Sequence, residues 1–473
     1  MEKLGHSICT KPLLLPILLL ATLLSGCASY GTISNKALEG DTPRSSVYSV
    51  QNTIDRTRPG EVTLILAFSG GGSRAAALAY GVLEELRDTR VELEGKPRRL
   101  LDEIDAISSV SGGSFTAAYY GLNGEQLFTD FKDVFFRRDI DKELIRSVIN
   151  PALWFSSRGR TDMAVDIYEN SIFKGATFAD LRRRSGPMIL INATDLAGGV
   201  RFSFQQEYFD LLCSDLSTFP VARAVTASSA VPVLFNSVVI ENYTGCGAHT
   251  EAWLSNAERN AADSQQLRKT VSTMQSYARK SERRYIHLVD GGVTDNLGLR
   301  AIHESVEMAG GIRNFIAQID GRPKRRFVVI SVNASTVPGM EIEATPKVPS
   351  VEQTLNAVTD IQLHHYNAAT LDLMRESVKR WSSEMSSSEN HVEGYFVTVD
   401  FEAVNEPEKR RFFNQIPTSF SLNGEQVDSL IAAGHELLRA NPEYQRFIHD
   451  LDRAARPSLV SQQQGHSEPG SLH

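Results

Sequence analysis

The stretch Ile104–Tyr120 (IDAISSVSGGSFTAAYY) constrains the fold more than any other part of this chain. An alternating apolar run ends at Ser111, and glycines followed by small and aromatic residues at helical spacing come after it. A strand that turns through a serine into a helix lifts the hydroxyl out of the sheet and points the helix N-terminus at a neighbouring oxyanion. Ser111 is therefore a candidate nucleophile. The pattern G-x-S-x-G is incomplete, because Ser109 replaces the first glycine, and an ordinary Ser/Gly turn remains an alternative.

Apolar strand-like runs alternate with helical patterns along the chain. Three of these runs are nearly continuous, as in strands buried on both faces of a sheet: VTLILAF at 62–68, MILINAT at 188–194 and FVVISV at 327–332. This alternation predicts an α/β fold with a mostly parallel central sheet. Ligands of such sheets bind at the carboxyl ends of the strands, where Ser69, Ser111 and Asp290 are expected.

The domain prediction is one catalytic unit over residues 61–335 with additions. A charged helical insertion at 251–284 lies just before the Asp290 strand, and either a lid or an outer structural helix would fit it. Residues 336–455 contain a long helical pattern, a strand and a final amphipathic helix, which we expect to extend the same sheet. The polar tail at 456–473 is predicted to be disordered.

The first residues resemble a bacterial lipoprotein signal. An apolar run of signal-peptide length ends in Leu-Ser-Gly-Cys, so residues 1–26 are predicted to be removed and Cys27 to receive the lipid anchor. Residues 27–60 would then be a tether. Ala28 follows the cysteine, and its similarity to sorting signals of Gram-negative bacteria implies the periplasmic face of the outer membrane. A plain secretory peptide with an incidental cysteine is the alternative.

Charge and cysteine content limit the partners. A formal net charge of −8 argues against nucleic acid as the main partner and against electrostatic attraction to anionic lipid. After processing, Cys213 and Cys246 are the remaining cysteines, and they form either one disulfide or two free thiols. No H-E-x-x-H, paired C-x-x-C or EF-hand pattern is present in the sequence, so we predict neither a metal nor a cofactor.

A glycine run, Gly70-Gly71-Gly72, lies between a strand and a helix. Its backbone N–H groups and the helix dipole favour an oxyanion or a phosphate, and the loose dinucleotide fingerprint is also satisfied. Arg74 stands in the first helical turn, where a cation opposes the dipole. It is expected to pair with an acid or a substrate phosphate, unless it is simply solvated.

Asp290 leaves a buried strand in the sequence Val-Asp-Gly-Gly. Alone, this would be read as an Asp-Gly turn. The order of a glycine loop, a serine elbow and an Asp-Gly-Gly, each at a strand end, instead favours a shared catalytic site.

These motifs together resemble the patatin-like phospholipase family, and the resemblance covers roughly residues 62–335. It implies a three-layer α/β sandwich in which Ser111 is the nucleophile, Asp290 its base, and Gly70, Gly71, Gly72 and Gly112 the oxyanion hole. ASSAVP at 227–232 and NATDL at 192–196 also look like family landmarks, of structural type around the cleft. The implied activity is hydrolysis of acyl esters of membrane phospholipids.

Three rival interpretations stay open. A histidine-dependent hydrolase would use His303, which follows Asp290 but lies inside a helical pattern. A nucleotide-binding protein would use the glycine run and leave Ser111 and Asp290 unexplained. A catalytically inactive lipid-binding lipoprotein would leave the same serine and aspartate without a purpose.

Overall fold

The computed structural model describes most of the chain from residue 31 onward. The described residues are 31–38, 47–53, 61–140, 142, 159–184, 186–232, 234–246, 249–319, 321–337, 343 and 346–455. The predicted signal peptide at 1–26, the anchor residue Cys27 and the tail at 456–473 lie outside these ranges.

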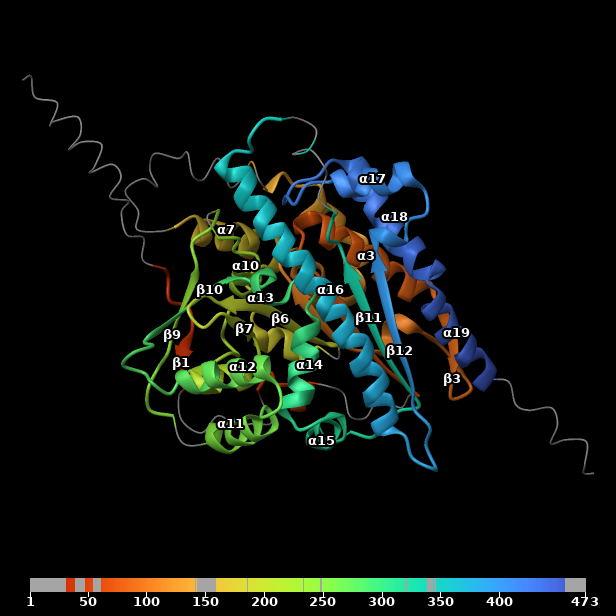
Figure 1. The fold of residues 1–473 in the computed structure, drawn as a ribbon, viewed down its shortest axis with the longest axis horizontal. Helices are drawn as coiled ribbons and strands as arrows, with labels where there is room; N and C mark the ends of the chain where they lie inside the picture. The colour runs from red at the N-terminus through yellow and green to blue at the C-terminus, as the bar shows by residue number, and fades with distance from the viewer. Residues whose placement is uncertain are drawn as a thin grey trace, which may run out of the picture.

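A central sheet of eight strands organises the molecule (Figure 1). Five neighbouring strands run parallel, in the order β12, β11, β2, β5 and β6. Beyond β6 the pairing becomes antiparallel, through β10 to β9, and β7 also pairs with β6. The strands are β2 (Val62–Phe68), β5 (Ile104–Val110), β6 (Met188–Asp195), β7 (Val200–Ser203), β9 (Val238–Glu241), β10 (Tyr285–Asp290), β11 (Arg326–Asn333) and β12 (Glu393–Asp400).

Helices cover both faces of the sheet and complete three layers. On one face lie α3 (Gly72–Asp88), α4 (Gly112–Asn123) and α18 (Gly424–Ala440), and on the other lie α14 (Leu299–Met308) and α16 (Val351–Met385). In Figure 1, α16 crosses in front of β11 and β12. The predicted α/β class with a mostly parallel central sheet is therefore confirmed.

Alternation along β11 shows why both faces need helices. Val328 and Ile330 belong to the apolar core shared with α3, whereas Phe327 and Val329 pack with Trp381 of α16. Successive side chains of a strand point to opposite faces, so a run with no polar break forms two cores.

The remaining strands and α-helices are short or peripheral. They are β1 (Lys36–Ala37), α2 (Val50–Thr53), β3 (Arg90–Leu93), β4 (Lys96–Arg99), α5 (Leu127–Phe131), α7 (Arg160–Tyr168), α8 (Phe178–Arg183), α9 (Gln206–Leu211), β8 (Ser214–Asp215), α10 (Val221–Ser228), α11 (His249–Asn260), α12 (Gln265–Ser276), α13 (Gly292–Asp295), α15 (Ile312–Gln318), α17 (Pro407–Gln415) and α19 (Pro442–Ala455). Within the described residues, none of the helices has both the length and the apolar character required to cross a bilayer.

The C-terminal extension is built into the same sheet. Strand β12 pairs with β11 along its whole length, from Glu393 to Asp400. Helix α18 packs on α3, where a side-chain carbon at Gly434 would lie 2.3 Å from the carbonyl oxygen of Leu78. The two helices can approach this closely because the crossing point carries a glycine.

The described parts of the predicted tether pack against the domain. Strand β1 pairs with β8, and Tyr48 is 1% exposed. The Tyr48 hydroxyl accepts a hydrogen bond from the N–H of Ile189 over 2.7 Å and lies 3.1 Å from its carbonyl oxygen. The expectation of a free tether through residue 60 is corrected for these residues, since burial of an aromatic ring favours docking over extension.

The insertion at 251–284 forms α11 and α12. Leu267, Val271 and Met274 of α12 are buried, and the segment after α12 is fixed by hydrogen bonds to Asp195 from Tyr277 (2.9 Å) and Arg283 (2.5 Å). These contacts describe an outer structural layer. Nearby, Cys213 and Cys246 form a disulfide with their Cα atoms 5.3 Å apart.

Candidate active site

Ser111 occupies the turn between β5 and α4. Its backbone has φ 48° and ψ −123°, and the residue is 6% exposed. A positive φ is uncommon for a residue with a side chain and stores strain that the surroundings must hold. The strand-to-helix turn predicted from the sequence therefore has the strained backbone of a nucleophile elbow.

Asp290 lies beside this serine. Ser111 Oγ donates a hydrogen bond to Asp290 Oδ2 over 2.9 Å, and the N–H of Gly292 donates to Asp290 Oδ1 over 2.7 Å. The carboxylate is thus oriented by the glycine pair that follows it and keeps one oxygen for the serine. The structure brings together the two residues singled out in the sequence, although they lie far apart along the chain.

The strand that carries Asp290 runs antiparallel to the strand that precedes Ser111. Strand β10 is antiparallel to β6, and Asp290 is paired with Ala193. In the other direction β6 is parallel to β5, and Asn192 is paired with Val110. The end of β10 therefore comes level with the end of β5 from the opposite direction, and Asp290 lies at the carboxyl end of its strand, as predicted.

Burial changes the acidity of this carboxyl group. Asp290 is 7% exposed, and burial raises its pKa to about 6, although the hydrogen bonds from Gly292 and Ser111 act to lower it. Desolvation disfavours the charged form, so the carboxylate holds a proton more tightly than an aspartate in water. A base with a pKa near neutrality accepts a serine proton more readily than an ordinary aspartate does.

The glycine loop lies directly against the elbow. A side-chain carbon at Gly112 would stand 1.9 Å from the carbonyl oxygen of Gly72, and one at Gly70 would stand 3.3 Å from Ser111 Cβ. Gly112 requires glycine because two backbones meet there, and at Gly70 a side-chain carbon would also stand 2.6 Å from Asn296 Oδ1. The N-termini of α3 and α4 consequently converge beside Ser111.

The expected role of Gly70 as an oxyanion donor is corrected by its hydrogen bonding. Its N–H donates to the carbonyl oxygen of Asn296 over 2.9 Å and is thereby occupied. Within the described residues no hydrogen bond uses the N–H of Gly71, Gly72 or Gly112. These three N–H groups are the donors left for an oxyanion, and Gly70 serves as a point of close approach.

Ser228, at the end of α10, was not assigned a role from the sequence. Its Oγ accepts the N–H of Ser111 over 2.8 Å and donates to the carbonyl oxygen of Asn192 over 2.6 Å. Its carbonyl oxygen accepts the N–H of Gly291, and that of Ala230 accepts the N–H of Asp290, each over 3.0 Å. The end of α10 therefore holds both the serine turn and the aspartate turn. The landmark ASSAVP marked this segment, but only the folded contacts identify its function.

Ser228→Ala is expected to lower kcat about 10- to 100-fold with little change in KM, because the buried N–H of Ser111 loses its acceptor and the strained turn relaxes. Steady-state kinetics on a soluble ester would measure this. Ser229→Ala is the matched control, since the Ser229 hydroxyl bonds to Val225 within its own helix. Equal losses in the two variants would contradict the positioning role.

Asn296 is a second residue that the sequence did not indicate. Its carbonyl oxygen holds Gly70, and its side-chain nitrogen donates to Ser335 Oγ over 3.2 Å. Asn367 of α16 donates to the same Ser335 oxygen over 3.0 Å. Asn296 thus links the glycine loop to the helix that crosses above it.

Arg74 has a structural role, but its hydrogen-bond partners are not the acid or phosphate predicted from the sequence, and its burial excludes the solvated alternative. The side chain is 4% exposed and donates to the carbonyl oxygens of Ala334 (2.8 Å) and Ile416 and to Thr418 Oγ1 (3.1 Å). Burial lowers its pKa to about 10, partly offset by the charge of Asp360. The guanidinium group fastens the start of α3 to two loops, and its donors are directed at protein oxygens.

His303 faces away from the serine, toward α16. Its Nδ1 lies 3.1 Å from Ser377 Oγ, and its ring stacks on Trp381 with centroids 5.9 Å apart. Burial lowers its pKa. These contacts are those of a packing histidine and do not support the histidine-dependent alternative.

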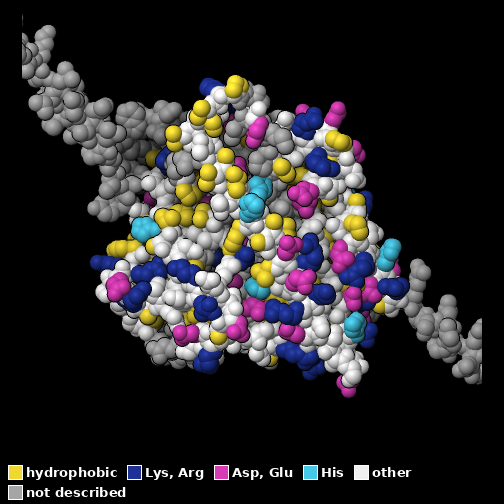
Figure 2. Space-filling view, in the orientation of Figure 1, with side chains coloured by type: hydrophobic (Ala, Val, Ile, Leu, Met, Phe, Trp, Pro, Cys, Tyr) yellow, Lys and Arg dark blue, Asp and Glu magenta, His cyan; other side chains and the backbone are white. Residues whose placement is uncertain are grey.

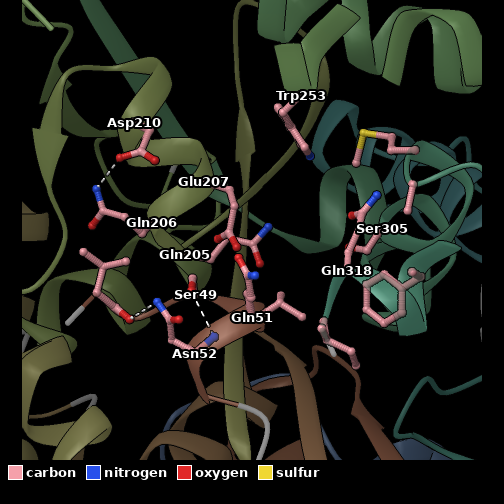
Figure 3. A pocket seen from close by; sticks show the side chains of 16 residues that line it. Ser49, Gln51, Asn52, Gln205, Gln206, Glu207, Asp210, Trp253, Ser305 and Gln318 are labelled. Carbon is pink, nitrogen blue, oxygen red and sulfur yellow. Dashed lines mark hydrogen bonds between the residues drawn. The ribbon is translucent and has the colours of Figure 1, made fainter. Parts of the chain in front are cut away.

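A separate cavity of about 550 Å³ lies elsewhere, between α9, α15 and the segment around Ser49 (Figure 3). Gln205, Glu207 and Trp253 line it, whereas Ser111 and Asp290 do not. Among the residues that the structure describes, no group of three or more His, Cys, Asp or Glu is placed to hold a metal ion.

The fold and this site define an α/β protein with a serine–aspartate pair at a strand–turn–helix elbow. The family model of patatin-like phospholipases matches residues 66–303, half of the chain, and the protein therefore belongs to that family. Membership supports hydrolysis of lipid esters. Comparison with curated proteins finds no match.

Solved structures of human GIVD cytosolic phospholipase A2 are distantly similar. The complex with methyl gamma-linolenyl fluorophosphonate has 12% identity and a TM-score of 0.39, covering 84% of this chain and 60% of that one. The structure without inhibitor has 12% identity and a TM-score of 0.38, covering 88% and 64%. This chain therefore spans less than two thirds of the length of those proteins, and a likeness so distant decides nothing about activity.

Proposed function

We propose that the protein is a serine acyl hydrolase that cleaves carboxylic esters of membrane phospholipids. The observation that carries this proposal is the 2.9 Å hydrogen bond from Ser111 Oγ to Asp290 Oδ2, within a chain of the patatin-like family. Serine needs an adjacent base to become a competent nucleophile.

In the proposed reaction, Ser111 Oγ attacks the ester carbonyl carbon while its proton moves to Asp290. The N–H groups of Gly71, Gly72 and Gly112 would stabilise the oxyanion, the step that usually contributes most to catalysis. Asp290 then returns the proton to the leaving alcohol, and the acyl group stays on Ser111. Water then attacks the acyl carbon while Asp290 takes its proton, and Asp290 passes this proton to Ser111 Oγ as the bond to the acyl group breaks and the fatty acid leaves.

Two measurements with the purified full-length protein test the proposal. Phospholipids with different acyl chains at the two positions are incubated with the protein, and mass spectrometry identifies the released fatty acid and lysophospholipid. A fluorophosphonate probe is then mapped by peptide mass spectrometry, and we expect the adduct on Ser111. Absence of both product and adduct would favour the inactive lipid-binding alternative.

The pH dependence follows from the raised pKa of Asp290. The base works in its ionised form, so kcat/KM is expected to fall about tenfold per pH unit below about pH 6 and to level off above it. A pH–rate profile on a neutral soluble ester would show this acidic limb. Asp295 is the control, because burial raises its pKa to about 6 as well, and its side chain accepts the N–H of Ala301.

An acidic limb that survives in Asp295→Asn supports assignment to Asp290. Disappearance of the limb in that variant, with the protein still folded, would assign it to Asp295 and contradict the prediction.

We also propose that lipidated Cys27 anchors the protein to the periplasmic face of the outer membrane, which would place the enzyme next to its substrate. The Leu-Ser-Gly-Cys sequence supports this address. Mass spectrometry of the mature N-terminus, together with membrane fractionation, tests it.

A further inference from the structure

The N-terminal half of α16 carries exposed aliphatic side chains. Val351, Val358 and Ile361 are 78%, 52% and 50% exposed, and Val348, just before the helix, is 83% exposed. Figure 2 shows apolar side chains gathered on the upper part of this face and charged ones dense over the lower part. We call Val348, Val351, Val358 and Ile361 the apolar ridge. A cluster of this kind marks an interaction site more often than scattered exposed residues do.

The apolar ridge belongs to the same end of the molecule as the serine–aspartate pair. Farther along α16, Asn367 bonds to Ser335, which also holds Asn296 beside Gly70. Asp360, next to Ile361, lies close enough to Arg74 in the first turn of α3 for its charge to offset part of the lowering of the Arg74 pKa. In Figure 1 this half of α16 extends past the carboxyl ends of β11 and β12.

A further exposed aliphatic side chain lies next to the serine–aspartate pair. Val293 is 56% exposed and follows Gly292, whose N–H orients Asp290. Helix α13, which contains Val293, packs against α16. An exposed apolar side chain therefore also stands at the immediate border of the site, on a helix that contacts α16.

The charge of the segment that carries the apolar ridge indicates which kind of lipid surface it would bind. Residues 348–371 contain no Lys or Arg and include the acidic Glu352 and Asp360, and Lys347 flanks the segment. Because the acidic residues outnumber this lysine, attraction to anionic headgroups contributes little, and insertion of aliphatic side chains among lipids needs no such attraction. The matching partner is a bilayer rich in zwitterionic lipid.

We propose that the apolar ridge docks on the bilayer and brings the serine–aspartate pair to its lipid substrate. This inference rests on the proposed function, because a lipid substrate is what makes a bilayer the occupant. The ridge side chains would enter the boundary between headgroups and acyl chains, with Val293 facing the same surface.

Fluorescence of a label on the ridge tests docking without catalysis. In a Ser111→Ala background, Val358→Cys is labelled with an environment-sensitive NBD group, and Lys379→Cys, exposed on the C-terminal half of the same helix, is the matched control. With phosphatidylcholine vesicles, we expect the label at 358 to shift to shorter wavelength and to be quenched by spin-labelled lipid. The label at 379 should keep its aqueous emission.

Identical responses at the two positions would overturn the proposal. Energy transfer between labelled chains without quenching by lipid would also overturn it, and would instead identify a second copy of the chain as the occupant.

Activity gives an independent check. Replacing Val351, Val358 and Ile361 together by serine should reduce hydrolysis of vesicle lipid about tenfold or more and leave hydrolysis of a water-soluble short-chain ester unchanged. Glu376→Ser with Lys379→Ser is the control. Equal losses on both substrates would contradict docking. If the unmodified protein hydrolyses neither substrate, the proposed function fails while the fluorescence result still decides docking.

Discussion

Ser111→Ala is expected to reduce ester hydrolysis by on the order of 10⁶-fold and to abolish labelling by a fluorophosphonate. The variant has no atom that can form the acyl intermediate, and the remaining N–H groups can stabilise only attack by water. Sensitive product detection by mass spectrometry measures the first effect, and probe labelling measures the second. The fold should be unchanged, since alanine removes one buried hydroxyl that bonds only to Asp290 among the described residues.

Ser109→Ala provides the comparison for this result. Ser109 lies on β5, two residues before Ser111, and its hydroxyl donates to the carbonyl oxygen of Leu190 over 3.0 Å. This variant also loses a buried hydroxyl near the elbow, yet we expect activity within a few-fold of the unmodified protein. Full activity in Ser111→Ala would rule out the acyl-serine mechanism.

Asp290→Asn is expected to lower kcat by about 10² to 10⁴, the usual contribution of a general base. Asparagine keeps the size of the side chain and can still accept from the N–H of Gly292, but it cannot take the serine proton. Single-turnover kinetics on an activated ester would separate the acylation step, which should carry the loss. Circular dichroism would confirm that the variant is folded.

His303→Ala distinguishes a serine–aspartate pair from a triad. Because His303 contacts Ser377 and Trp381, its loss should affect packing and leave kcat within a few-fold. A folded His303→Ala variant as inactive as Asp290→Asn would show that a histidine takes the proton and that the proposed mechanism is wrong.

The main elements of the fold were predictable because their sequence signals are local. The buried strands at 62–68 and 188–194 are continuous apolar runs, and the turn at Ser111 is marked by the glycines after it. Strand direction was not predictable, since the apolar run of β10 has the same composition whether it lies parallel or antiparallel. The reversal at β6 depends on contacts between segments far apart in the chain.

The roles of individual residues around the site were harder to predict from the sequence, because they too depend on contacts between segments far apart in the chain. Gly70 and Gly72 are indistinguishable in sequence, yet only the N–H of Gly70 is occupied by Asn296. From the sequence, Arg74 could have bound a substrate phosphate or served a structural role. Its hydrogen bonds to the carbonyl oxygens of Ala334 and Ile416 show the structural role. Ser228 is one of two consecutive serines, and only its contact with the N–H of Ser111 separates it from Ser229.

The distance along the chain between the two hydrogen-bonded residues also sets a delay between their synthesis on the ribosome. Ser111 and Asp290 are 179 positions apart. At about 5 to 20 residues per second, roughly 10 to 40 s pass between synthesis of the serine and synthesis of the aspartate. During that interval the hydroxyl has no partner to accept its proton, and β10, which must insert beside β6, has not been made. A nascent chain therefore cannot form the serine–aspartate pair until most strands of the sheet have been synthesised.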